Sequence, residues 1–360
     1  MFGLATTRSS VHFVLARALV PRLVSARPGA QGWTAHESVT ANVGESLQIG
    51  GGDRAGDAIV LKTSGFLTPG RQEIFTPGAR PVLVDREQAV IDASQFVVEA
   101  RSARARDGTS IDYFLLRPRK ASAGPVPTLM TGYGAFGISF APGYFDEALG
   151  GRSLQVWLSR GGALVLPAIR GGGERGEAWH RAAMREKRQV SYDDFAAVSA
   201  DLISSGFTTS AHLGVFGLSN GGLLAATMGL QRPDLYAAIV SDVPLTDMLR
   251  YPRMGMGAAW IDEYGDPDDP EAAKVLLTYS PLHIVREGVR YPQFLVTIST
   301  EDNRVGPGHA RKLAARLEQV GAKVHFFEDQ EGGHGVSDPL VRPEMMARRM
   351  TFLVDALMPR

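Results

Sequence analysis

The chain has 360 residues and contains no cysteine. This absence excludes a disulfide framework, a thiolate zinc site and a cysteine nucleophile, but it leaves the cellular compartment open, because disulfide-free proteins work on either side of a membrane. The chain also lacks a charge excess, since 38 Lys and Arg residues balance 38 Asp and Glu residues. Nothing in this balance points to nucleic acid, an anionic membrane or an acidic partner.

Long hydrophobic runs are missing as well. Charged residues or glycines interrupt every apolar run well before the ~20 residues that a membrane-spanning helix needs. We therefore expect a soluble protein of the cytoplasm, with a periplasmic or organellar location left open. Residues 1–36 contain no acid, and their apolar run is punctuated by Arg8, Arg17, Arg22 and Arg27. This pattern favours the first strands of a β-rich domain over a targeting segment, which stays an alternative.

The pattern of the chain changes near Ala93. Before it, short apolar runs such as Ala58 to Leu61 and Pro81 to Val84 are separated by clusters of Gly, Pro and Asp, which is typical of short antiparallel strands. After it, runs at 95–105 and 110–117 flank an Asp107-Gly108 turn and predict a hairpin. We expect a β-rich segment at 1–92 and an α/β domain at 93–360.

Strands and helices alternate beyond Pro127. The predicted strands are short apolar runs of the kind buried in a parallel sheet, at 128–131, 163–168, 213–216, 238–241, 294–299 and 324–327. The predicted helices lie at 154–159, 192–203, 221–230, 309–320 and 344–357. Repetition of strand, helix and strand predicts a doubly wound sheet with helices on both faces.

A G-x-S-x-G sequence, Gly217 to Gly221 with Ser219 at its centre, follows one predicted strand and opens a helix. This is the context of a nucleophile elbow, in which a tight turn strains the serine backbone and requires neighbours without a Cβ. The helix behind the serine aims backbone N–H groups at any negative charge that forms there. A glycine-rich turn with a serine of no catalytic role is the alternative at this point.

A serine hydroxyl needs a base, and the base needs a group that holds its tautomer. In α/β-hydrolases these residues follow in the order serine, acid, histidine. Asp302 follows the strand 294–299 and His334 follows the strand 324–327, so both lie at the sheet edge that carries Ser219. Glu301 and Asp242 are weaker candidates for the acid.

Six motifs stand in one order along the second part of the chain: Thr131-Gly132-Tyr133-Gly134-Ala135-Phe136, Ile169-Arg170-Gly171-Gly172-Gly173-Glu174, Gly217-Leu218-Ser219-Asn220-Gly221-Gly222, Gln231-Arg232-Pro233-Asp234-Leu235, Asp302-Asn303-Arg304-Val305 and Gly333-His334-Gly335. Together they resemble the catalytic domain of the prolyl oligopeptidase family of serine peptidases. The resemblance runs from about Ala93 to Arg360 and implies an α/β-hydrolase fold.

The resemblance implies roles for individual residues. Ser219, Asp302 and His334 match the catalytic triad of the family. Tyr133 matches the tyrosine whose hydroxyl forms the oxyanion hole together with the backbone N–H of the residue after the nucleophile, here Asn220. A phenol donor placed at the developing oxyanion stabilises the transition state by on the order of 3 kcal/mol.

A pocket for proline is implied in the same way. Trp260 matches the tryptophan that stacks on the proline ring at the cleaved position, and Arg304 matches the arginine that holds the carbonyl of the preceding substrate residue. An apolar aromatic slot suits a flat pyrrolidine ring. The further lining residues are Phe136, Tyr264, Val305 and Leu245, which stands in place of a smaller valine and is expected to narrow the slot.

The N-terminal part departs from the family pattern. Family members place a seven-bladed β-propeller around the hydrolase domain, where it limits substrates to short peptides. Only about ninety residues precede Ala93, enough for roughly the last blade and a connection. The leading hypothesis is a serine peptidase that cleaves short peptides after proline through an acyl-enzyme. A carboxylesterase with an open site that accepts small esters, and an inactive remnant or binding module, are the alternatives.

No cofactor or metal is expected. The glycine-rich segment 171–176 lacks the Lys-Ser or Lys-Thr of a phosphate loop, so we interpret it as structural. The acids Asp193 and Asp194 have no accompanying histidine cluster. We interpret them as residues of a helix N-terminus that offset the helix dipole.

Overall fold

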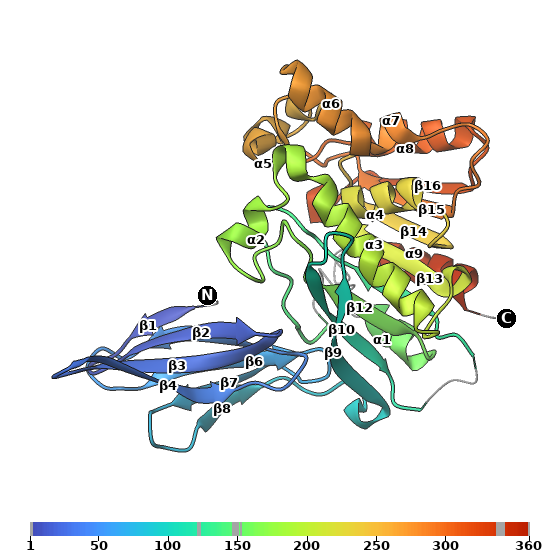
Figure 1. The fold of residues 1–360 in the computed structure, drawn as a ribbon. Coiled ribbons are helices and arrows are strands. Elements are labelled where there is room, and N and C mark those ends of the chain that lie inside the picture. Colours follow the sequence, from blue (N-terminus) through green and yellow to red (C-terminus); the bar gives the residue numbers. More distant parts are fainter. Residues whose placement is uncertain (1–2, 121–123, 146–150, 152, 336–342, 359–360) are drawn as a thin grey trace. The chain divides into compact units, whose positions relative to one another are not determined.

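The computed structural model describes residues 3–120, 124–145, 151, 153–335 and 343–358 (Figure 1). The chain divides into two compact units. The first comprises Met1–Arg101, Phe114–Lys120 and Ala141–Asp146, and the second comprises Ser102–Tyr113, Ala121–Phe140 and Glu147–Arg360.

The first unit contains two four-stranded antiparallel sheets. One has the order β1 (Leu4–Thr6), β2 (Val11–Arg17), β3 (Val20–Gly29), β4 (Gly32–Thr40). The other has the order β5 (Glu45–Gly52), β6 (Ile59–Gly65), β7 (Arg71–Phe75), β8 (Val82–Arg86). The run of apolar residues and arginines near the N-terminus therefore forms strands. Two sheets stand where the sequence predicted roughly one blade and a connection.

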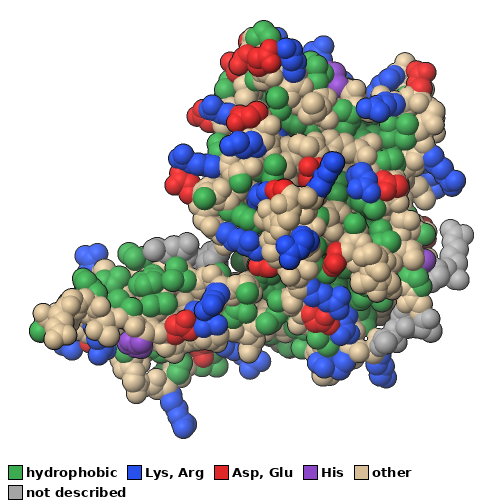
Figure 2. All heavy atoms as spheres, viewed as in Figure 1, with side chains coloured by type: hydrophobic (Ala, Val, Ile, Leu, Met, Phe, Trp, Pro, Cys, Tyr) green, Lys and Arg blue, Asp and Glu red, His purple; other side chains and the backbone are tan. Residues whose placement is uncertain are grey.

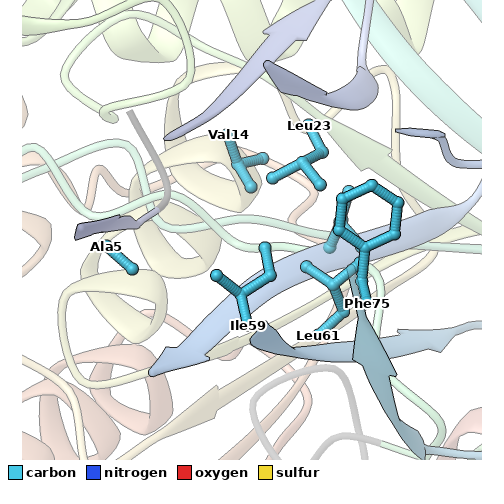
Figure 3. Close-up of a cluster of buried hydrophobic side chains, with 7 residues drawn as sticks. Ala5, Val14, Leu23, Ile59, Leu61 and Phe75 are labelled. Atoms are coloured by element: carbon cyan, nitrogen blue, oxygen red, sulfur yellow. The ribbon is translucent and has the colours of Figure 1, made fainter. Parts of the chain in front are cut away.

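One hydrophobic cluster joins the inner faces of these two sheets. Side chains alternate between the two faces of a strand, so every second residue of a strand can enter a shared core. Figure 3 shows Val14 and Leu23 of the first sheet beside Ile59, Leu61 and Phe75 of the second. All five side chains are buried, which makes this cluster the core of the unit.

An eight-stranded sheet has the order β16-β15-β14-β13-β11-β12-β10-β9. The pairs from β12 through β11, β13, β14 and β15 to β16 are parallel. The strands are β9 (Phe96–Arg104), β10 (Ser110–Pro118), β11 (Thr128–Thr131), β12 (Ala163–Pro167), β13 (Leu213–Leu218), β14 (Ala238–Asp242), β15 (Gln293–Ser299) and β16 (Val324–Asp329). Each predicted strand is confirmed; the apolar residues of the inner strands β11 to β15 are buried on both faces, whereas the edge strand β16 is only partly buried.

Helices cover this sheet. The five predicted helices are α1 (Ser153–Ser159), α3 (Gln189–Ser204), α4 (Asn220–Gln231), α8 (Gly308–Gln319) and α9 (Pro343–Leu357). The sequence prediction missed α2 (Glu177–Arg181), α5 (Ile261–Tyr264), α6 (Pro270–Tyr279) and α7 (Pro281–Ile284). In Figure 1, α3 and α4 cross in front of the sheet and α9 lies behind it, so the doubly wound α/β-hydrolase architecture is confirmed.

The acids of α3 have a different environment from the predicted one. The helix begins at Gln189, so Asp193 and Asp194 lie beyond its first turn. Asp194 is buried and accepts two hydrogen bonds from the Arg170 guanidinium, from Nε at 2.9 Å and from Nη2 at 2.6 Å. Asp194 therefore ties the loop after β12 to α3 and does not serve the helix dipole.

The surface carries mixed charge. On the face shown in Figure 2, Lys and Arg side chains are interspersed with Asp and Glu side chains. Within the described ranges, no helix combines the length and the apolar character that crossing a membrane requires.

A buried ion pair anchors α9 to the sheet. Arg349 of α9 donates from Nη2 to Oδ2 of Asp242 at the end of β14, and its guanidinium lies 4.3 Å from the centre of the Phe216 ring. Thr297 of β15 donates to the other carboxylate oxygen of Asp242 at 2.6 Å. Because the Asp242 side chain is fully buried, its charge depends on these partners.

We expect Arg349→Met to lower the free energy of unfolding by about 3–5 kcal/mol, because it removes the buried guanidinium that donates to the Asp242 carboxylate. Chemical denaturation of the wild type and the variant measures this free energy. Lys274→Met is the control, since Lys274 pairs with Glu271 on the surface, where the side chains are 70% and 78% exposed, and its loss should cost under about 1 kcal/mol. Equal small losses for both variants would contradict the anchoring role.

Candidate active site

The turn between β13 and α4 carries Ser219. Its backbone has φ 60° and ψ −118°, a conformation that non-glycine residues adopt only where their surroundings enforce it. A Cβ on Gly217 would lie 1.9 Å from the carbonyl oxygen of Gly221, so the turn requires glycine there. The Ser219 N–H donates to the Asp242 carbonyl at 2.9 Å. These contacts hold the serine at the first turn of α4, as a nucleophile elbow requires.

Asp302 and His334 are hydrogen-bonded to each other. Asp302 follows β15 and His334 lies in the turn Gly333–Gly335 after β16, at the sheet edge where Ser219 follows β13. The Nδ1 atom of His334 lies 2.8 Å from Oδ2 of Asp302. A carboxylate can only accept, so Nδ1 carries the proton and Nε2 is the basic nitrogen of the neutral ring.

The Asp302 carboxylate is stabilised in its ionised form. Burial alone would raise its pKa, but the hydrogen bond with His334 and the backbone N–H groups of Val305 and Arg304 lower the pKa below the usual value for aspartate. The two N–H groups donate to Oδ1 at 2.9 Å and 3.0 Å. Asp302 is thus prepared to hold an imidazole and to stabilise an imidazolium.

Tyr133 lies beside the serine. Its loop follows β11, and an interaction with the Ser219 side chain opposes part of the rise in the Tyr133 pKa that burial causes. Burial raises the pKa of Tyr133 above its ordinary value, so the hydroxyl stays protonated and can donate. Asn220 is the first residue of α4, where backbone N–H groups have no partner within the helix. A phenol O–H and a helix N–H are therefore available at the serine.

An aromatic cluster adjoins Tyr133. The Phe136 ring lies 6.4 Å from the Tyr133 ring and 5.6 Å from the Tyr264 ring, which it meets edge to face at 87°. Trp260 is half-buried and ends the 3-10 turn that precedes α5. The remaining predicted pocket residues differ in exposure: Leu245 and Val305 are buried, and Arg304 is exposed.

Comparison with known proteins shows the family of the chain. The pattern of the prolyl oligopeptidase family matches residues 150–360, more than half of the chain. The chain belongs to the prolyl oligopeptidase family. It is 40% identical over 313 residues to an uncharacterized peptidase of Sinorhizobium fredii, covering 86% of this chain and 42% of that one. It is 36% identical over 243 residues to a prolyl endopeptidase of Dictyostelium discoideum, covering 65% of this chain and 31% of that one.

Solved structures agree with this membership. A post-proline cleaving enzyme from Rickettsia typhi superimposes with a TM-score of 0.86 at 31% identity, covering 98% of this chain and 51% of that one. The chain thus spans about half the length of the structures it matches and less than half that of the curated relatives. The predicted family is confirmed.

A glycine-rich loop of this prolyl oligopeptidase family chain supports the loop of Tyr133. A Cβ on Gly171 would lie 2.1 Å from the Gly134 carbonyl oxygen, and a Cβ on Gly173 would lie 2.1 Å from that of Gly137. The Gly137 N–H also donates to the Gly171 carbonyl at 3.1 Å. The two backbones pack directly against each other, which explains the run of glycines without a phosphate ligand.

Two charged residues near the site were not found by sequence reasoning. Arg188 precedes α3 and is fully buried, and Glu263 of α5 is 4% exposed. Arg188 stands outside the expected motifs, and Glu263 stands between the predicted pocket residues Trp260 and Tyr264 without having been given a role. Only burial of their charges marks them. No group of three or more His, Asp or Glu side chains that could hold a metal ion occurs in the part of the chain that the structure describes.

Glu174 lies in the glycine-rich loop, and one of its two carboxyl oxygens is buried. The residue as a whole is half-buried, but its Oε2 atom is buried without a hydrogen-bond partner. Desolvation raises the pKa of Glu174 to about 8, against the opposing backbone hydrogen bonds from Glu174 itself and Phe140. The folded protein therefore keeps a proton here that the unfolded chain loses near pH 4.5.

We expect Glu174→Gln to stabilise the protein increasingly between pH 5 and pH 8. Over this interval the folded wild type binds more protons than the unfolded chain, so its stability falls as pH rises, and glutamine removes that titration. Thermal unfolding at pH 5, 7 and 9 measures the difference, which should level off above about pH 8. The exposed Glu177→Gln is the control, and a difference that is independent of pH in Glu174→Gln would contradict the assignment.

Proposed function

We propose that this chain is a serine peptidase that cleaves short peptides on the carboxyl side of proline. The observation that carries the proposal is the Asp302–His334 hydrogen bond of 2.8 Å at the same sheet edge as the strained Ser219. Strain at the serine and a carboxylate-oriented imidazole are the features that nucleophilic acyl transfer needs. We infer that the residues 93–360 form the catalytic domain and that 1–92 form a β-propeller part.

The first half of the reaction forms an acyl-enzyme. Ser219 Oγ attacks the carbonyl carbon of the substrate proline, while His334 Nε2 accepts the serine proton. Asp302 holds the proton on Nδ1 and stabilises the imidazolium. The Tyr133 hydroxyl and the Asn220 N–H donate to the oxyanion of the tetrahedral intermediate.

Collapse of the intermediate breaks the peptide bond. His334 donates its proton to the leaving amine, which departs and leaves an ester between the substrate acyl group and Ser219. Water then attacks this ester while His334 accepts a proton from the water. The bond between the acyl carbon and Ser219 Oγ breaks, His334 returns the proton to Oγ, and the product acid is released. The same groups act twice because the second half reverses the roles of the first.

Specificity is assigned to the aromatic cluster and its neighbours. We propose that Trp260 stacks on the proline ring, with Phe136 and Tyr264 as further walls, and that Leu245 and Val305 close the slot. Arg304 is exposed, so it can donate to the carbonyl of the preceding substrate residue. The relative from Dictyostelium discoideum carries the name prolyl endopeptidase, and the Rickettsia typhi structure that of a post-proline cleaving enzyme, which supports this substrate class.

We expect a fluorophosphonate probe to label the chain at Ser219, and Ser219→Ala to abolish both labelling and hydrolysis of a blocked glycyl-prolyl anilide. Mass spectrometry of the labelled peptide and anilide kinetics measure this. Ser204→Ala changes an exposed serine of α3 and should leave both unchanged. A folded chain that stays unlabelled would refute the hypothesis of an enzyme. Turnover of aryl esters without turnover of anilides would refute the hypothesis of a peptidase.

We expect Asp302→Asn to lower kcat by about 10⁴-fold, because an amide allows the wrong imidazole tautomer. Glu301→Gln, at the exposed neighbouring position, is the matched control and should keep wild-type kcat. The wild-type rate should also fall at acid pH, since a protonated imidazole cannot accept the serine proton. Asp302 does not cause this fall, because its lowered pKa keeps it ionised. A rate that is equal at pH 5 and pH 8 would contradict the role of His334.

A further inference from the structure

A buried polar network lies behind the aromatic cluster. The Arg188 side chain is fully buried, and its guanidinium lies 5.4 Å from the centre of the Tyr264 ring. Its Nη1 atom donates to Glu263 Oε1 at 3.4 Å, and its Nη2 atom donates to Asn220 Oδ1 at 3.1 Å. The guanidinium thereby joins a carboxylate of α5 to the residue that follows the nucleophile.

Arg188 decides how the Asn220 amide is oriented. A guanidinium can only donate, so the side-chain oxygen of Asn220, and not its nitrogen, must face Arg188. The Tyr264 hydroxyl donates to the same oxygen at 2.7 Å. The Asn220 amide nitrogen is therefore directed the other way, where it donates to the Tyr133 carbonyl at 2.6 Å.

This last hydrogen bond connects the two halves of the proposed oxyanion hole. Asn220 supplies its backbone N–H from the start of α4, and Tyr133 supplies its hydroxyl from the loop after β11. The two residues are 87 positions apart in the chain. Their relative position consequently depends on tertiary contacts, of which the Asn220 side chain is one that touches both.

Glu263 extends the network to the wall of the pocket. Its Oε1 atom accepts the backbone N–H of Phe136 at 3.0 Å, and its Oε2 atom lies 2.7 Å from Nε2 of His180. Phe136 has φ 58°, a left-handed conformation that needs support at a residue other than glycine. Glu263 therefore balances the charge of Arg188 and holds Phe136 in its strained position.

We propose that Arg188, with Glu263 as its counter-charge, is a positioning residue that sets the distance between the two oxyanion donors through the Asn220 side chain. This inference rests on the proposed function, because it concerns the oxyanion hole of that reaction. A buried ion pair is a poor source of stability, since apolar side chains of similar volume stabilise a core as well or better. Its value here is orientation, because a guanidinium fork fixes two acceptors at once.

The test uses the full chain with Arg188→Met, Arg188→Lys and Asn220→Ala. Arg188→Met should lower kcat for a blocked glycyl-prolyl anilide by about 100-fold, the size that a misplacement of about 1 Å causes. KM should stay within a factor of about three, because an oxyanion forms in the transition state and not in the bound substrate. Asn220→Ala keeps the backbone N–H and should likewise lower kcat while KM stays nearly unchanged.

Two readouts separate positioning from general damage. Affinity for a peptidyl-prolinal aldehyde, which forms a tetrahedral adduct with the serine, should fall in parallel with kcat, while affinity for the product peptide should not change. Arg188→Lys keeps the charge and should retain more kcat than Arg188→Met. Thr227→Val is the control, since it removes one buried hydrogen bond from α4 to the Tyr279 carbonyl and changes none of Arg188, Glu263 and Asn220. It should lower the melting temperature while keeping kcat.

The outcomes distinguish this inference from the proposed function. A wild-type chain that neither labels with fluorophosphonate nor cleaves anilide refutes the proposed function itself. An active wild type whose folded Arg188→Lys and Asn220→Ala variants keep full kcat and aldehyde affinity refutes the positioning role alone. Should Arg188→Met fail to fold, the other two variants decide by the same measurements. Equal losses of kcat in Thr227→Val would likewise overturn the inference, because they would show general damage.

Discussion

The turn between β13 and α4 is the constraint on which the site depends. Its geometry is enforced from three directions. A Cβ on Gly217 would lie 1.9 Å from the Gly221 carbonyl oxygen, and a Cβ on Gly221 would lie 2.8 Å from the Gly132 carbonyl oxygen. The Ser219 N–H donates to the Asp242 carbonyl. The nucleophile Ser219 and the N–H proposed for the oxyanion, that of Asn220, belong to successive residues of this turn. Every other group of the site must come to this point from elsewhere in the chain.

Buried arginine–carboxylate pairs bring those groups into place. Arg349 and Asp242 join α9 to the strand beside the nucleophile, and Arg170 and Asp194 join the loop after β12 to α3. Arg188 joins Glu263 to Asn220. Such pairs contribute little net stability, since desolvation offsets most of the Coulomb attraction. Their common property is that each connects elements remote in sequence through directional hydrogen bonds, and directional bonds specify position better than apolar contacts do.

The parts that could be predicted from sequence are those that local chemistry controls. Buried parallel strands appear as short apolar runs, and the G-x-S-x-G turn appears as its own motif, because both require particular residues at adjacent positions. The missed elements have weaker local signals: α5 and α7 have four residues each, and α6 is marked only by its Asp269 cap and Pro270. The environment of Asp194 was predicted wrongly, because its partner Arg170 lies 24 positions away.

The sequence by itself determined the family, the order of the parallel strands and of five helices, and the candidates Ser219, Asp302 and His334. It did so because spacing along the chain controls turns, periodicity and motif order. Only the tertiary structure decided that Asp302 holds Nδ1 of His334, which way the Asn220 amide is directed, and that Arg188 and Glu263 lie behind the pocket. Hydrogen bonds between distant residues depend on how helices pack on the sheet, and no local pattern of residues encodes that packing.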